Sequence, residues 1–201
     1  MWGMKPEERL ANILEKRRCT HLGIGPMSKN CVDAVIELAD ELDLPIMLIA
    51  SRRQIEAAEL GSGYVNNWTT ESFARYVKEK DKKGNIILAR DHGGPWQNYS
   101  EVKENMDLKR AMASSKRSFE ADIRSGFQMI HIDPSIDIQK EPTADEVLER
   151  LFELYAHCWA VAEKEKKGIF FEVGTDEQSG DQQDLEFFEE TAKRISDFCV
   201  R

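Results

Sequence analysis

The sequence predicts an α/β fold in which about five βα units build a parallel sheet that forms part of a TIM (β/α)8 barrel. Short apolar runs of strand length alternate with longer segments whose apolar residues recur at helical spacing. Parallel neighbouring strands need crossover connections, and these amphipathic segments supply them. Residues 21–201 allow about 36 per unit, so eight units would need about 290. We therefore expect one (β/α) barrel-type domain over residues 1–201, incomplete at the carboxyl end, with an open doubly wound sheet as the alternative architecture.

The individual elements are predicted from these runs and from helix-capping residues. The predicted strands lie at 21–25, 45–50, 85–89, 129–133 and 169–173. The predicted helices lie at 5–18, 28–42, 69–77, 104–125, 143–161 and 185–199. The uninterrupted apolar run at 45–50 is typical of a strand that is buried on both faces of a parallel sheet. Ser28, and Thr69 or Thr70, can cap the helices that follow them, and Thr143 begins a capping-box sequence.

The composition excludes several classes of protein. Lys and Arg number 28 against 37 Asp and Glu, a net charge of −9, and so acidic a chain is not expected to bind nucleic acid. No run approaches the roughly 18 apolar residues of a membrane span, and the amino terminus lacks the apolar segment of a signal peptide. The four cysteines are scattered without a C-x-x-C pair, so we expect reduced thiols in a cytoplasmic protein.

Polar residues gather at the carboxyl ends of the predicted strands, where both barrels and doubly wound sheets bind their ligands. Asp91 and His92 follow the third strand, His131 and Asp133 end the fourth, and Glu172 lies in the fifth. Unpaired polar groups inside apolar strands cost several kcal/mol to bury, so we expect these side chains to converge on a functional site. Because Glu172 follows two phenylalanines, we expect its carboxylate to be paired, bound to a metal or raised in pKa.

The fourth strand gives the sharpest of these predictions. His131 and Asp133 are two residues apart, so they share one face of the strand. An imidazole and a carboxylate on one wall can bind a divalent metal or transfer protons; alternatively, they form a buried hydrogen bond that only stabilises the strand. After the third strand, Gly93 and Gly94 turn the chain and would let a ligand approach the backbone, unless Asp91 only caps that turn.

The glycines of the first strand leave a nucleotide-binding alternative open. Gly23-Ile-Gly25 followed by Ser28 approaches the G-x-G-x-x-G pattern, although serine replaces its third glycine. No acid ends the second strand to bind a ribose, but Arg52-Arg53 could hold the 2′-phosphate of NADP. This alternative leaves the acids and imidazoles of the third to fifth strands without a role.

Several segments, in the same order, resemble one known family. Residues 91–97, DHGGPWQ, resemble D-H-L-G-P followed by W-Q, without the two residues that separate Pro from Trp. Residues 125–135, SGFQMIHIDPS, resemble A-G-F-x-K-I-H-L-D-x-S, and residues 173–176, VGTD, resemble I-G-T-E. Residues 50–54 and 63–64 are similar to A-T-x-N-Q and G-G-Y. The chain thus resembles the tagatose-bisphosphate aldolase subunits long labelled non-catalytic, whose relatives include sugar and sugar-phosphate 4-epimerases.

The resemblance implies a class II aldolase-like barrel, in which a divalent metal polarises a ketose carbonyl while carboxylates move protons. Nitrogen and oxygen ligands together suit zinc or manganese. The candidate site comprises Asp91, Glu172 and Asp176 as catalytic residues, His92 and His131 as metal ligands, and Ser51, Gln54, Gly93, Gly94, Asp133 and Ser135 as substrate-binding residues. Two positions depart from the family: Asp176 replaces a glutamate, and Ile49 replaces the acid of the second strand and cannot transfer a proton.

We expect a metal-dependent aldolase or 4-epimerase-type enzyme, or a domain of one, that acts on a ketose or ketose phosphate. The alternative is a non-catalytic subunit that stabilises a catalytic aldolase, which Ile49 and the short chain favour. Because five units cannot close a barrel, two strand edges and an apolar inner wall would stay exposed, so we expect a homo-oligomer or a partner subunit that completes the barrel. The strands are predicted in sequential order; an order reversal would favour the NADP-binding doubly wound domain.

Overall fold

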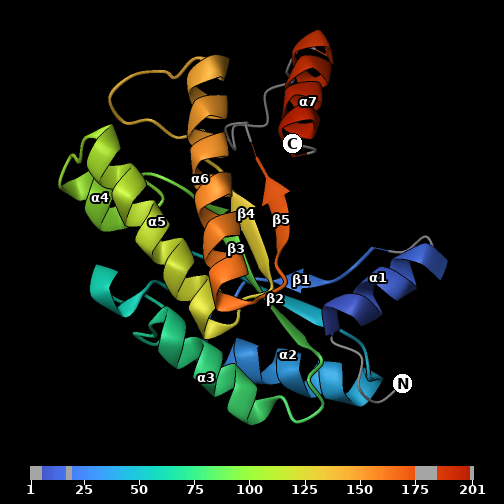
Figure 1. Ribbon diagram of the computed structural model, residues 1–201. Coiled ribbons are helices and arrows are strands. Elements are labelled where there is room, and N and C mark those ends of the chain that lie inside the picture. The colour runs from blue at the N-terminus through green and yellow to red at the C-terminus, as the bar shows by residue number, and fades with distance from the viewer. Residues whose placement is uncertain (1–5, 17–19, 175–184, 200–201) are drawn as a thin grey trace.

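A computed structural model describes residues 6–16, 20–174 and 185–199. Five parallel strands form a sheet in sequential order (Figure 1). The strands are β1 (Gly23–Ile24), β2 (Ile46–Ser51), β3 (Ile86–Gly93), β4 (Met129–Ile132) and β5 (Phe170–Val173). This order confirms the predicted topology and argues against the nucleotide-binding alternative, because a doubly wound sheet reverses its strand order at the switch point.

Helices precede, connect and follow the strands, and those between the strands cover one face of the sheet. They are α1 (Pro6–Lys16), α2 (Lys29–Leu42), α3 (Thr70–Lys80), α4 (Tyr99–Lys103), α5 (Leu108–Ser125), α6 (Ala144–Glu165) and α7 (Leu185–Cys199), with a 3-10 turn, η1, at Ala58–Leu60. Figure 1 shows α2, α3, α5 and α6 together on one side of the sheet, with α1 apart from them. A doubly wound fold places helices on both faces, whereas a barrel carries them on its outer face. The chain therefore forms a sector of a (β/α)8 barrel.

Polar caps determine where several helices begin. Ser28 caps α2, and Thr143 begins the predicted capping box of α6. Of the two threonines considered for α3, Thr69 is the cap and Thr70 is the first helical residue. The side-chain oxygens of these caps accept backbone N–H groups that have no partner inside the helix.

The prediction of one helix over 104–125 is wrong at its amino end. The structure has a short helix, α4, and then α5, which begins only at Leu108. Asn105 adopts a left-handed φ of 49°, which interrupts helical geometry. Asp107 then caps α5 by accepting the N–H of Arg110 at 2.8 Å.

The long helices are amphipathic. In α5, Met112, Phe119 and Ile123 are buried, while Ala113 and Arg117 are exposed. Among the described helices, none combines the length and apolar character needed to cross a bilayer.

The two faces of the sheet differ in burial. On the helix-covered face, Ile46 and Leu48 of β2 are buried. On the inner face, Met47 and Ile49 stay partly exposed, and the exposed fraction of Phe170 reaches 49%. Within the described residues, β1 and β5 each pair with a strand on one side only. The inner wall therefore has open edges, as expected of an incomplete barrel.

Candidate functional site

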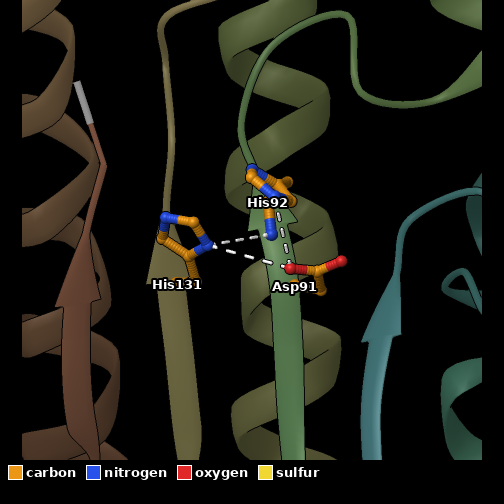
Figure 2. A group of neighbouring side chains, drawn as sticks. All are labelled: Asp91, His92 and His131. Carbon is orange, nitrogen blue, oxygen red and sulfur yellow. Dashed lines mark hydrogen bonds and ion pairs between the residues drawn. The ribbon is translucent and has the colours of Figure 1, made fainter. Parts of the chain in front are cut away.

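The candidate site lies where β3 and β4 end. β3 extends four residues beyond its predicted end to Gly93, so Asp91 and His92 belong to the strand itself. The register with β4 shifts between Arg90 and Gly93, and His92 has a left-handed φ of 42°. Strand alternation would send Asp91 and His92 to opposite faces, but this irregularity turns both toward the same cluster. Figure 2 shows their side chains gathered beside His131, which comes from β4.

Asp91 faces both imidazoles. Its Oδ1 lies 3.5 Å from Nε2 of His92 and 3.9 Å from Nδ1 of His131. The three residues each offer one ligand atom, and these atoms lie within 4.8 Å of one another. The three side chains retain between 12% and 36% of their exposure, so a small ligand can reach them. The structure thus brings three of the predicted site residues together.

The buried carboxylate of Asp133 orients the imidazole of His92. Nδ1 of His92 lies 2.6 Å from Oδ2 of Asp133, whose side chain is buried. Ser135 donates its hydroxyl to Oδ1 of Asp133 at 2.5 Å and its backbone N–H to the same oxygen at 3.1 Å. With the carboxylate accepting Nδ1–H, Nε2 of His92 is free to act as an electron-pair donor toward the side of Asp91.

His131 lies among negatively charged side chains. Its Nδ1 accepts the backbone N–H of His92 at 3.2 Å. Burial opposes protonation of this imidazole, but the side chain of Asp91 and the charges of Glu172 and Asp133 outweigh it and raise the pKa of His131 above its usual value. The cluster therefore attracts positive charge, from a proton or from a metal ion.

The donor set fits a divalent metal of borderline softness. Two imidazole nitrogens and one carboxylate oxygen are ligands that zinc and manganese accept. A metal-binding histidine commonly donates its other ring N–H to a carboxylate, and His92 has such a partner in Asp133. Among the described residues, Asp91, His92 and His131 are the one group of three His, Cys, Asp or Glu side chains with ligand atoms this close.

The family model for D-tagatose-1,6-bisphosphate aldolase subunit GatZ/KbaZ-like proteins matches residues 14–193. The chain belongs to this family. Membership confirms the family resemblance read from the sequence motifs and relates the chain to tagatose-bisphosphate aldolase. A search of curated protein sequences returns no match.

A solved structure shares the fold of this GatZ/KbaZ-like chain. A probable tagatose 6 phosphate kinase from Sinorhizobium meliloti 1021 matches with a TM-score of 0.71 and 21% identity. The match covers 90% of this chain and 44% of that one, so this chain spans less than half of that protein's length. Fructose-bisphosphate aldolase from Campylobacter jejuni matches with a TM-score of 0.47 and 13% identity, over 98% of this chain and 67% of that one. The first match supports the fold alone.

Of the two carboxylates predicted in the fifth unit, Glu172 and Asp176, only Glu172 lies within the described residues. Glu172 lies opposite His131 in the register of β4 and β5, but it is exposed. The hydrophobic surroundings expected for Glu172 are therefore not found, because its neighbour Phe170 lies on the open inner wall. Asp176 lies outside the described residues. On the other side of the cluster, Ser51 is the register partner of Asp91 and remains half-buried.

The remaining predicted substrate-binding residues contact protein atoms. The side-chain oxygen of Gln54 accepts the N–H of Ser51 at 3.0 Å, and Gln54 is buried. Gly93 and Gly94 are also buried. A Cβ on Gly93 would lie 2.2 Å from the ring of Phe119, and a Cβ on Gly94 would lie 2.1 Å from the carbonyl oxygen of Asp133. These glycines therefore let the end of β3 pack closely against Phe119 and the backbone of Asp133.

We expect Gly94→Ala to destabilise the protein by about 1–3 kcal/mol, because the added methyl group would displace the backbone at Asp133. Denaturant unfolding measures the loss. The matched control is Gly168→Ala, at a glycine with no heavy atom within 4 Å of its would-be Cβ, which should change stability by less than about 0.5 kcal/mol. Equal effects of the two substitutions would contradict this account of Gly94.

Two arginines are buried in ion pairs that the sequence patterns did not predict. Arg52 pairs with Glu56 and Glu101, and Arg90 pairs with Asp122; all of these side chains are at most 1% exposed. The NADP-phosphate interpretation of Arg52 is wrong, because protein groups enclose its guanidinium. The positive charges of Arg52 and Arg90 lower the pKa of Glu56 although burial opposes ionisation. The burial of Arg90 could have been predicted, because it occupies a helix-facing position in an apolar strand. A charged side chain in such a position needs a partner inside the protein.

Proposed function

We propose that this chain is a metal-dependent aldolase or 4-epimerase-type enzyme, or a domain of one, and that it acts on a ketose or ketose phosphate. The observation that carries the proposal is the cluster of Asp91, His92 and His131 at the carboxyl ends of β3 and β4. Membership of an aldolase-related family supports the same class of chemistry. The carboxyl ends of barrel strands are also where such enzymes place their reacting groups.

The residues of the cluster take separate roles in this proposal. His92 and His131 would hold zinc or manganese, which would polarise the ketose carbonyl when bound. Asp133 keeps His92 in the tautomer that presents Nε2. Asp91 moves a proton at its carboxylate oxygens, with Glu172 or Asp176 as the second acid–base group. Ser51, beside Asp91, contacts the substrate. Cleavage followed by re-addition on the opposite face would give a 4-epimer from the same groups.

Two measurements test this function. Metal-stripped protein titrated with Co²⁺ should bind the ion saturably and show visible absorption typical of imidazole ligation. Ketose phosphates incubated with the metal-loaded protein should then yield either shorter sugar phosphates, by aldol cleavage, or the 4-epimer. A protein that neither binds the ion nor changes any of these sugars is not this enzyme.

A second candidate is a non-catalytic subunit that stabilises a catalytic aldolase. The open edges of β1 and β5, the exposed inner wall and the apolar Ile49 on β2 favour it. In this case a second copy or a partner subunit covers the wall and completes the barrel. Sedimentation tests self-association, and a well-folded monomer at high concentration argues against it. The subunit role is tested by co-expression: a longer half-life of a catalytic aldolase in the presence of this chain supports it.

A further inference from the structure

Arg52, which directly follows β2, lies at the centre of a buried ionic network. Its Nε donates to Oε2 of Glu56 at 2.8 Å, and its Nη2 donates to Oε1 of Glu101 at 2.7 Å. Its Nη1 donates to the backbone carbonyl of Gly94 at 2.7 Å. The side chains of Arg52, Glu56 and Glu101 are at most 1% exposed. The three branches of one guanidinium therefore reach three different segments.

This network holds the backbone segment that follows His92 at three points. Arg52 binds the carbonyl of Gly94, and Oε2 of Glu101 accepts the N–H of Trp96 at 2.6 Å. Glu56 accepts the side-chain amide of Asn98 at 2.9 Å. The segment needs such restraint, because Trp96 has a left-handed φ of 59° that a bulky side chain rarely adopts.

The same segment fixes the position of Asp133. The N–H of Asp133 donates to the carbonyl of Gly93 at 2.7 Å, and Gly94 packs directly against the carbonyl of Asp133. Asp133 in turn holds Nδ1 of His92. A continuous path of contacts thus runs from Arg52 through the two glycines to Asp133 and the imidazole.

We propose that Arg52 is a positioning residue of the metal cluster: by fastening residues 94–98, it keeps Asp133 within hydrogen-bonding distance of His92 and so aims Nε2 of His92 at the shared ligand position. This inference rests on the proposed function, because it assigns Arg52 a role in that site. Lysine cannot replace arginine here, since a single ammonium group lacks the planar fork that reaches Glu56, Glu101 and the Gly94 carbonyl together.

The test compares Arg52→Lys with the wild-type protein by two readouts. Co²⁺ titration measures affinity and the visible spectrum of the bound ion, and NMR follows the Nδ1–H proton of His92, which is protected while Asp133 accepts it. We expect Arg52→Lys to bind Co²⁺ roughly 10–100-fold more weakly, the effect usual for loss of a group that orients a ligand, with an altered spectrum and a lost Nδ1–H signal. If Arg52→Lys does not fold, Glu101→Gln, which loses one charged anchor of the same segment, is measured in its place.

Val77→Ala is the control for a general loss of stability. Val77 is buried in α3 near the start of β3, remote from residues 94–98. It should lower the unfolding midpoint and leave the Co²⁺ affinity and spectrum unchanged. A matching loss of affinity in Val77→Ala, or wild-type affinity together with an intact Nδ1–H signal in Arg52→Lys, overturns the proposal. If the wild-type protein itself binds no Co²⁺, the proposed function fails, and the Nδ1–H signal alone then decides: its loss in Arg52→Lys supports positioning, and its survival overturns it.

Discussion

His92→Ala and His131→Ala should each weaken Co²⁺ binding by roughly 100-fold or more, because each removes one of the two imidazole ligands assigned to the metal; losing only an orienting group already costs about 10–100-fold. The fold should survive both changes, since the side chains are 30% and 12% exposed and neither fills the core between sheet and helices. Metal content and the unfolding midpoint, measured on the same samples, separate a loss of ligand from a loss of folding.

His157→Ala is the matched control for these two variants. His157 lies on α6 beside Glu120, 3.1 Å away, and takes no part in the cluster. It should bind Co²⁺ as the wild-type protein does. If His92→Ala and His131→Ala also bind the ion normally, then His92, His131 and Asp133 form only a structural hydrogen-bond group and the metal site does not exist.

Asp122→Ala should have the largest effect on stability, a loss of about 3–5 kcal/mol in the free energy of unfolding. Both side chains of the pair are fully buried, and Arg90 donates Nε and Nη2 to the two oxygens of Asp122 at 2.7 and 2.6 Å. Removal of the carboxylate leaves a guanidinium without its counter-charge inside the protein. Arg90 also donates to the carbonyls of Ala50 and Ile55, so a displaced guanidinium would also lose its hydrogen bonds to the carboxyl end of β2 and the loop after it.

Arg124→Ala, on the same helix α5, provides the comparison. Arg124 pairs with Glu120 and Glu165 at the surface, where its side chain is 49% exposed. Exposed ion pairs contribute about 0–1 kcal/mol, so this substitution should have a small effect. A loss below about 1 kcal/mol for Asp122→Ala in denaturant unfolding would show that the buried pair does not stabilise the fold as proposed.

Part of the candidate site followed directly from the sequence. His131 and Asp133 lie two residues apart, and period-two alternation is enough to place them on one face of β4. Glu172 could not be placed in this way, because its exposure depends on whether other strands cover the inner wall. The ring of Phe170 lies in that open wall, so an apolar neighbour in the sequence did not mean an apolar environment.

The alternation of strands and helices and the caps at Ser28 and Thr143 were determined by the sequence alone, because apolar periodicity and capping are local properties. The sequential order of the strands was predicted, but only the tertiary structure excluded the reversed order of the doubly wound alternative. The tertiary structure decided the site. Asp91 and His92 are adjacent, so alternation would separate them, and only the irregular pairing of β3 with β4, with its left-handed φ at His92, brings both to one cluster. That irregularity depends on contacts between residues far apart in the chain, which no local pattern encodes.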